Sequence, residues 1–176
     1  MKKLKKPGKK VIGIVAAVFV VVVGGIIALV LYMNREVAPW DTVSWSTTRE
    51  DIRSRFGEPD YSTGGRGNIH YDQYYNYEFL GMSGMIVYSY VDGGDGGTIS
   101  CVAWYYSFSS DKELKEEQLE RVKNYLTDRF GAPQKYTNGA TWHLDTWYNS
   151  DGKEIILEQD FYDSSMGIQY YFYNND

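Results

Sequence analysis

The chain has 176 residues, a formal net charge of −5 and one cysteine. This length accommodates one ordinary domain beside a targeting segment, and a single cysteine excludes an internal disulfide framework. The charge is unevenly divided, because residues 36–176 hold 11 Lys and Arg against 23 Asp and Glu, a net charge of −12. A region this acidic repels nucleic acid, so we expect no nucleic-acid partner.

The N-terminal region has the composition of a membrane anchor. Residues 1–10 contain six lysines, and residues 11–32 contain no charged side chain. A helix of this length spans roughly 33 Å, enough to cross a hydrocarbon core of about 30 Å. The lysines before the apolar run predict a signal anchor with a cytoplasmic N-terminus, and a cleaved signal peptide, with its shorter apolar region, is the alternative. The sequence therefore predicts a single-pass cell-membrane protein that contacts the bilayer through residues 11–32, with a linker at residues 33–44.

Residues 45–176 are expected to form an extracytoplasmic α+β domain made of two pseudo-repeats, residues 45–108 and 109–176. The motif Arg-Phe-Gly-x-Pro occurs at residues 55–59 and again at residues 129–133. Glycine followed by proline two residues later is typical of a helix C-terminus. Each copy of the motif therefore predicts the end of a helix in its pseudo-repeat.

Each predicted helix also has a start signal. Thr47 and Glu50 have the spacing of a capping box, and so do Ser110 and Glu113. An amphipathic stripe on the second helix consists of Leu119, Val122, Leu126 and Phe130. We expect Phe56, and its counterpart at the end of the second helix, to be buried where the helices meet the rest of the domain.

Six short segments rich in Tyr, Trp, Val and Ile are typical of strands. They are residues 71–78, 85–91, 99–108, 141–148, 154–160 and 167–173. Their connections are too short for crossovers and favour antiparallel meanders. The predicted fold class is therefore α+β: an N-terminal transmembrane helix, then two tandem αβββ units that form one antiparallel sheet of about six strands with the helices on one face.

A helix that ends in Phe-Gly-x-Pro and is followed by a β-meander, present twice, resembles the beta-lactamase-inhibitor-protein-like fold. It also resembles the small outer-membrane assembly lipoproteins of the SmpA/OmlA type. Residues 48–59 and 126–133 carry the resemblance. Those families usually place two helices in each unit, whereas this sequence predicts one. The resemblance implies the fold and a habit of binding proteins.

The 17 tyrosines are the most unusual feature of the composition. Period-two alternation separates strand residues into two faces. We expect the face under the helices to hold Met85, Val87, Cys101, Ala103, Ile155, Leu157, Ile168, Tyr170 and Phe172. The other face is expected to be uncovered and to bind another macromolecule through Tyr88, Tyr90, Trp104, Tyr106, Trp147 and Tyr171. The alternative is that these aromatic residues form cross-strand ladders that only stabilise the sheet.

No catalytic motif accompanies these elements. His70 and His143 do not lie beside a serine or cysteine in a known signature, and the glycines of residues 92–97 fit a hairpin better than a calcium loop. We therefore expect that the protein is not an enzyme and that it binds neither a metal nor a cofactor. The predicted function is a membrane-anchored extracytoplasmic module that engages a protein partner in an inhibitory or assembly role. The alternatives are a structural component of an envelope complex and a binder of cell-wall glycan.

Overall fold

The structure is a computed structural model that describes residues 20–25, 37–64, 69–91, 97–108, 112–161 and 163–172. The chain divides into two compact units, residues 1–36 and 37–176. The second unit includes part of the predicted linker, because Ala38 and Trp40 are buried in its core. The Trp40 ring stacks on the Tyr170 ring at a centroid distance of 5.6 Å.

The predicted membrane anchor requires a correction. Of the apolar run at residues 11–32, the structure describes residues 20–25, which are helical, and the rest of the run lies outside the described residues. Six residues of helix are roughly 9 Å long, against the roughly 30 Å of a bilayer core. No helix in the described part of the chain combines the length and the apolar composition of a membrane span. The predicted transmembrane helix, and with it the single-pass localisation and the cytoplasmic N-terminus, are therefore not supported.

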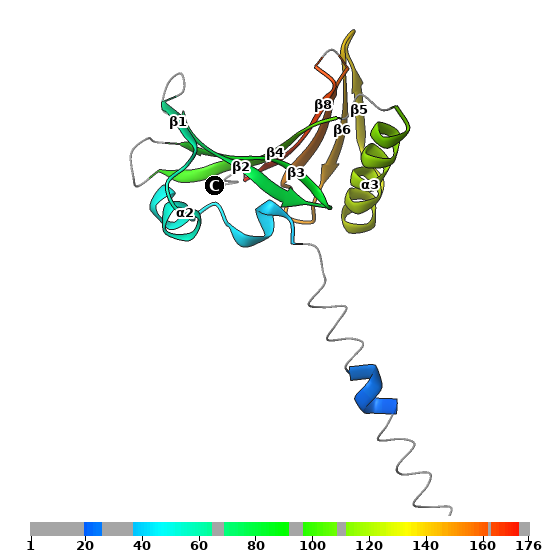
Figure 1. The fold of residues 1–176 in the computed structure, drawn as a ribbon, viewed down its shortest axis with the longest axis horizontal. Helices are drawn as coiled ribbons and strands as arrows, with labels where there is room; N and C mark the ends of the chain where they lie inside the picture. The colour runs from blue at the N-terminus through cyan, green and yellow to red at the C-terminus, as the bar shows by residue number, and fades with distance from the viewer. Residues whose placement is uncertain are drawn as a thin grey trace, which may run out of the picture. The chain divides into compact units, whose positions relative to one another are not determined.

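The second unit is built on one antiparallel sheet of eight strands, in the order β1-β2-β3-β4-β8-β7-β6-β5 (Figure 1). The strands are β1 (Tyr61–Gly64), β2 (Ile69–Phe79), β3 (Met82–Val91), β4 (Thr98–Ser107), β5 (Lys135–Asn138), β6 (Trp142–Tyr148), β7 (Glu154–Asp160) and β8 (Ser165–Tyr171). The helices are the 3-10 helix η1 (Pro39–Thr42), α2 (Arg49–Phe56) and α3 (Lys112–Phe130). The last strand of the second half pairs with the last strand of the first half, β4, so a single sheet runs through both halves.

The predicted arrangement of two αβββ units with about six strands is wrong. Each half contains four strands, because β1 follows α2 and β5 follows α3 before the three expected strands. These two strands form the edges of the sheet. Their sequences, YSTG and KYTN, are short and polar and have no apolar alternation. Hydrophobic patterning cannot detect such strands.

The ends of the helices follow their sequence signals closely. The N-cap of α2 is Thr48, one residue later than expected, and its hydroxyl accepts a hydrogen bond from the Asp51 backbone N–H while the Asp51 carboxylate accepts one from the Thr48 backbone N–H. The expected cap at residues 110–113 lies mostly outside the described residues. Gly57 and Gly131 end α2 and α3 at φ values of 84° and 80°, which other residues rarely adopt.

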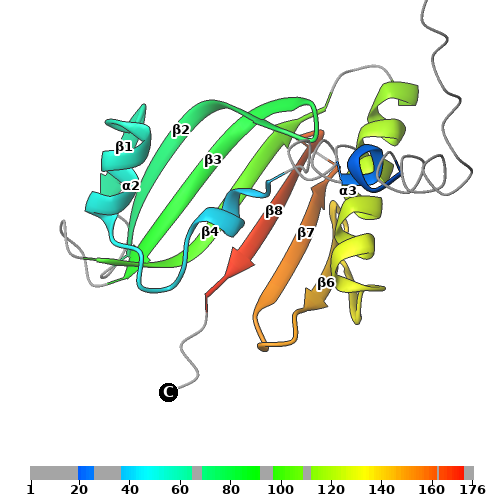
Figure 2. The same cartoon turned by 90° about the horizontal axis from the view of Figure 1, so that it is seen from below.

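The helices cover one face of the sheet. Seen from below, α2, η1 and α3 lie in front of the strands (Figure 2). From α2 and α3, Ile52, Val122 and Leu126 are fully buried in the core. Phe56 and Phe130, expected to be buried, are partly buried and pack against the edge of this core. We call this side of the sheet the covered face.

A buried ionic cluster links α2 to β1 and β2. The Arg49 guanidinium donates to both carboxylate oxygens of Asp72, at 2.6 and 2.9 Å, and the Arg53 Nε donates to the same carboxylate at 3.2 Å. The Ser62 hydroxyl also donates to it at 2.5 Å. Burial raises the pKa of Asp72, but these hydrogen bonds outweigh burial and lower the pKa to about 2.

Candidate binding surface

The structure places most of the predicted binding residues inside the protein. Tyr88, Tyr90 and Trp104 are 0% exposed and Trp147 is 1% exposed, and all four belong to the core of the covered face. The Trp147 Nε1 donates to the Gly131 carbonyl at the end of α3. The expectation that these four side chains form an uncovered face is therefore wrong.

The other two predicted residues have different positions. Tyr106 is half-buried against the core, where its ring stacks on Trp104 at 5.8 Å and its hydroxyl accepts a hydrogen bond from Gln118 of α3. Tyr171 lies on the face of the sheet opposite the helices. Of the six predicted residues, Tyr171 alone lines the cavity on that open face.

The pairing between strands explains the wrong assignment. Tyr88 pairs with Val102, which pairs with Tyr170, so Tyr88 lies on the same face as Tyr170 and not on the opposite one. A bulge interrupts the β2–β3 ladder between Tyr74 and Tyr77, and another interrupts β3–β4 next to Ser89. The extra residues belong to β2 and to β4 at Ser100, and the alternation of Tyr88 and Tyr90 in β3 is unbroken. Figure 1 also shows the sheet bending so that its ends rise away from α2 and η1.

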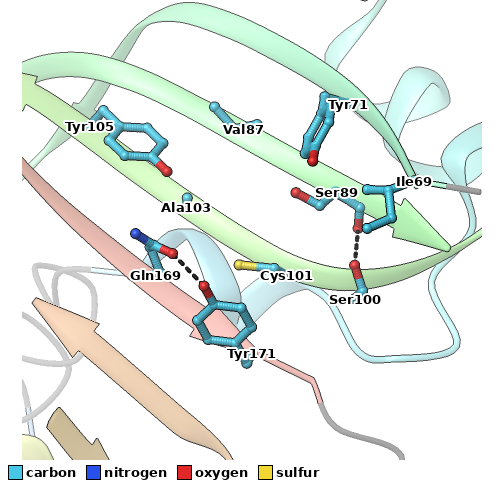
Figure 3. A pocket seen from close by; sticks show the side chains of 10 residues that line it. All are labelled: Ile69, Tyr71, Val87, Ser89, Ser100, Cys101, Ala103, Tyr105, Gln169 and Tyr171. Carbon is cyan, nitrogen blue, oxygen red and sulfur yellow. Dashed lines mark hydrogen bonds between the residues drawn. The ribbon is translucent and has the colours of Figure 1, made fainter. Parts of the chain in front are cut away.

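A hollow of about 280 Å³ lies on this open face. It is lined by Ile69, Tyr71, Val87, Ser89, Ser100, Cys101, Ala103, Tyr105, Gln169 and Tyr171. Figure 3 shows its construction: small side chains such as Ala103 form the floor, and the rings of Tyr71, Tyr105 and Tyr171 stand around it. These residues come from β2, β3, β4 and β8, the four strands at the centre and first half of the sheet. We call this cavity the sheet hollow.

Glycine makes room for one wall of the sheet hollow. Gly167 of β8 pairs directly with Tyr105 of β4. A Cβ atom at Gly167 would lie 2.7 Å from two carbons of the Tyr105 ring, closer than real Cβ contacts. The ring therefore lies across the position where a side chain of residue 167 would stand. A glycine inside a strand is a signal for such close approach, and sequence reasoning on the tyrosines alone missed it.

A second cavity, of about 590 Å³, adjoins the same ring. Tyr105 lines both cavities, and the second one also includes Tyr75, Asp163 and the predicted site residue Tyr106. Tyr75 is 50% exposed, so aromatic surface continues along β2 beyond the sheet hollow. The two cavities thus share Tyr105 as a lining residue.

Hydrogen bonds fix the wall of the sheet hollow. The Tyr171 hydroxyl donates to the Gln169 side-chain carbonyl at 2.5 Å, a bond drawn in Figure 3, and the Gln169 amide donates to the Glu158 carboxylate of β7 at 2.9 Å. Burial raises the pKa of Tyr105 to about 12, helped by the nearby Cys101 thiol and Glu158 carboxylate. The Tyr105 hydroxyl is therefore protonated at neutral pH, and the carboxylate next to this wall is that of Glu158, which is bonded to the lining residue Gln169.

Two reactive side chains of the described residues, Cys101 of the sheet hollow and His143 of β6, are buried or already hydrogen-bonded. Burial raises the pKa of the Cys101 thiol to about 12, which keeps it protonated and weakly nucleophilic at neutral pH. Both ring nitrogens of His143 are already engaged, by Asn138 and by Asp145. Within the described ranges, no group of three His, Cys, Asp or Glu side chains is placed to hold a metal ion.

The fold and the surface define a class: an α+β domain of two αββββ halves, with a continuous eight-stranded antiparallel sheet that is covered by helices on one face and open on the other. No protein-family model matches the chain, and no curated protein matches it. Among solved structures, an extracellular protein containing a SCP domain from Bacillus anthracis str. Ames is similar, with 7% identity, a TM-score of 0.36, and coverage of 78% of this chain. The aligned part spans about half, 48%, of that protein. A likeness at this score carries no inference about fold or function.

Proposed function

We propose that this protein is a binding module that engages a protein partner through the open face of its sheet. The observation that carries the proposal is the sheet hollow, where three tyrosine rings surround a floor of small side chains on a face that no helix of the described residues covers. Tyrosine is enriched at protein interfaces because its ring is apolar and its hydroxyl forms hydrogen bonds. An apolar concavity with a few polar groups is also the usual form of a binding site.

The chemistry of the described residues also favours binding over catalysis. A protonated thiol at Cys101 and a fully engaged imidazole at His143 are poor nucleophile and base candidates. Aromatic rings on an open sheet can also stack on sugars, so a glycan is the competing class of ligand. The experiment below distinguishes these two ligands.

Site-specific photo-cross-linking tests the proposal. Benzoylphenylalanine replaces Tyr71, which lines the sheet hollow, in the full chain, and irradiation follows in extract from the cells that make the protein. The control places the same group at Tyr136 of β5, which is 62% exposed and outside the sheet hollow. We expect a discrete protease-sensitive adduct from position 71 and none of the same mass from position 136.

A blocking variant completes the test. Ser89→Trp fills the sheet hollow without adding charge, and it should abolish the adduct while the circular dichroism spectrum stays native. Identical adducts from both positions, or an adduct that Ser89→Trp leaves unchanged, would contradict the proposal. An adduct that glycosidases remove and proteases do not would assign the surface to a glycan instead.

A further inference from the structure

The Lys and Arg side chains of the described residues lie away from the sheet hollow. Of the ten Lys and Arg among the described residues, eight lie in α2 and α3, on the covered face. Of the remaining two, Lys153 places its ammonium 5.1 Å from the centre of the Phe172 ring, in the core of the covered face. Lys135 belongs to the edge strand β5, far from the sheet hollow in strand order.

Three carboxylates lie along β7, the strand that pairs with β8. In β7, Ile155, Leu157 and Gln159 are buried, and the alternate positions, which face the open side, include Glu154, Glu158 and Asp160. Glu158 pairs in register with Gly167, whose other neighbour is Tyr105. A tyrosine ring and a carboxylate therefore flank the same glycine.

The Glu158 carboxylate is held in place rather than left free to rotate. One oxygen accepts the hydrogen bond from Gln169, and Gln169 is itself held by the Tyr171 hydroxyl. This chain of bonds orients the carboxylate at the wall of the sheet hollow. No cation of the described residues lies within ion-pair distance of Glu158, so its charge is available to a ligand.

We infer that the sheet hollow binds an arginine side chain displayed on an exposed segment of the protein partner. This inference rests on the proposed function and adds the chemistry of the partner. A planar guanidinium stacks on tyrosine rings and forms paired hydrogen bonds with a carboxylate, which matches Tyr105 and Tyr171 beside Glu158. The net charge of −12 on residues 36–176 also attracts a basic partner over a longer range.

A titration with a defined probe tests the inference directly. The probe is Nα-acetyl-arginine amide, added to the full chain, and the readout is the movement of the backbone amide resonances of Ala103 and Gly167. The control is Nα-acetyl-citrulline amide, which has nearly the same shape without the charge. We expect the arginine compound to bind about fivefold more tightly or better than citrulline.

A matched pair of variants assigns the effect to one carboxylate. Glu158→Gln keeps the shape of the side chain and should reduce the preference for arginine to about twofold or less. Glu117→Gln removes a carboxylate that pairs with Arg121 on α3, and it should leave the preference unchanged. Equal binding of arginine and citrulline, or an unchanged preference in Glu158→Gln, would overturn the inference.

The inference and the proposed function can fail separately. If the Tyr71 adduct forms and Ser89→Trp removes it, but arginine and citrulline bind equally, the sheet hollow binds a partner by other chemistry and the arginine inference is wrong. If the adduct does not form, the proposed function fails. Arginine binding without an adduct would show a cation site that no protein partner uses.

Discussion

On the covered face of the sheet, tyrosine and tryptophan side chains are packed where water is excluded, whereas on the open face three tyrosines surround a hollow. The same residue type therefore has two roles on strands that alternate between the faces. Trp104 and Tyr105 are neighbours in β4, yet the first is fully buried and the second lines the sheet hollow. The comparison teaches that aromatic content alone does not locate a binding surface, because burial decides which rings reach a partner.

The largest expected difference between the faces is in stability. Trp104→Ala should lower the free energy of unfolding by about 3–5 kcal/mol, because it leaves a cavity in the core. Tyr105→Ala, one residue along the chain, should cost about 1 kcal/mol, because the half-buried ring is open on one side. Urea unfolding followed by circular dichroism measures both values. A larger cost at Tyr105 than at Trp104 would reverse the assignment of the faces.

The ionic cluster on the covered face gives the next largest effect. Asp72→Asn removes the partner of the buried Arg49 and should cost about 3 kcal/mol. Glu117→Gln disrupts the exposed pair with Arg121 on α3 and should cost about 0.5 kcal/mol or less. Comparable losses in the two variants would show that the Asp72 cluster is not desolvated.

The same cluster makes the free energy of unfolding depend on pH in the acid range. The pKa of Asp72 is about 2 in the folded protein and near the ordinary aspartate value of 3.8 in the unfolded chain, so the unfolded state binds the proton more readily. The stabilisation, about 2 kcal/mol, is present above pH 4 and is lost as the pH falls through 2. In Asp72→Asn this part of the acid dependence should disappear, as urea titrations at pH 2, 3 and 5 can test.

On the open face, Gly167 gives a smaller and more specific effect. Gly167→Ala places a Cβ against the Tyr105 ring and should cost about 1–2 kcal/mol, because the ring has to move. In a Tyr105→Ala background the same substitution should be nearly neutral. A double-mutant cycle measures this coupling, and additive costs would mean that the ring does not lie across Gly167.

The smallest effect concerns a hydroxyl on the covered face. The Tyr88 hydroxyl is buried and makes no hydrogen bond in the structure, and burial raises the pKa of this side chain. Tyr88→Phe should therefore leave stability unchanged or raise it by up to about 1 kcal/mol. A loss above that amount would show that the hydroxyl has a partner and that the core is more polar than described.

The parts of the fold that the sequence could predict are those with local signals. The end of α2 and the end of α3 follow from the repeated Arg-Phe-Gly-x-Pro motif, since only glycine readily adopts the positive φ at residues 57 and 131. The edge strands β1 and β5 carry no apolar alternation, so they were missed. Alternation grouped residues correctly within β3 and β4, but it could not say which group of one strand shares a face with which group of the next, because that depends on the pairing of Tyr88 with Val102 and of Val102 with Tyr170.

The predicted binding residues and the lining of the sheet hollow have one residue in common. The expectation that aromatic side chains would lie on a sheet face without helices selected Tyr171, which lines the sheet hollow, together with four rings that the structure buries. Tyr71 and Tyr105 were absent from the prediction because their faces depend on the register between strands. Gly167 was the available signal, and its meaning required knowledge of its partner in β4.

Hydroxyl-radical footprinting of the full chain, read by mass spectrometry, tests the central claim most directly, because it measures the solvent access of each aromatic ring. The account predicts oxidation at Tyr71, Tyr105 and Tyr171, and protection of Tyr88, Tyr90, Trp104 and Trp147, with the exposed Tyr136 as the positive control. Oxidation of Tyr88 and Trp104 with protection of Tyr105 and Tyr171 would contradict it. That result would place the sheet hollow in the core and the open face on the other side.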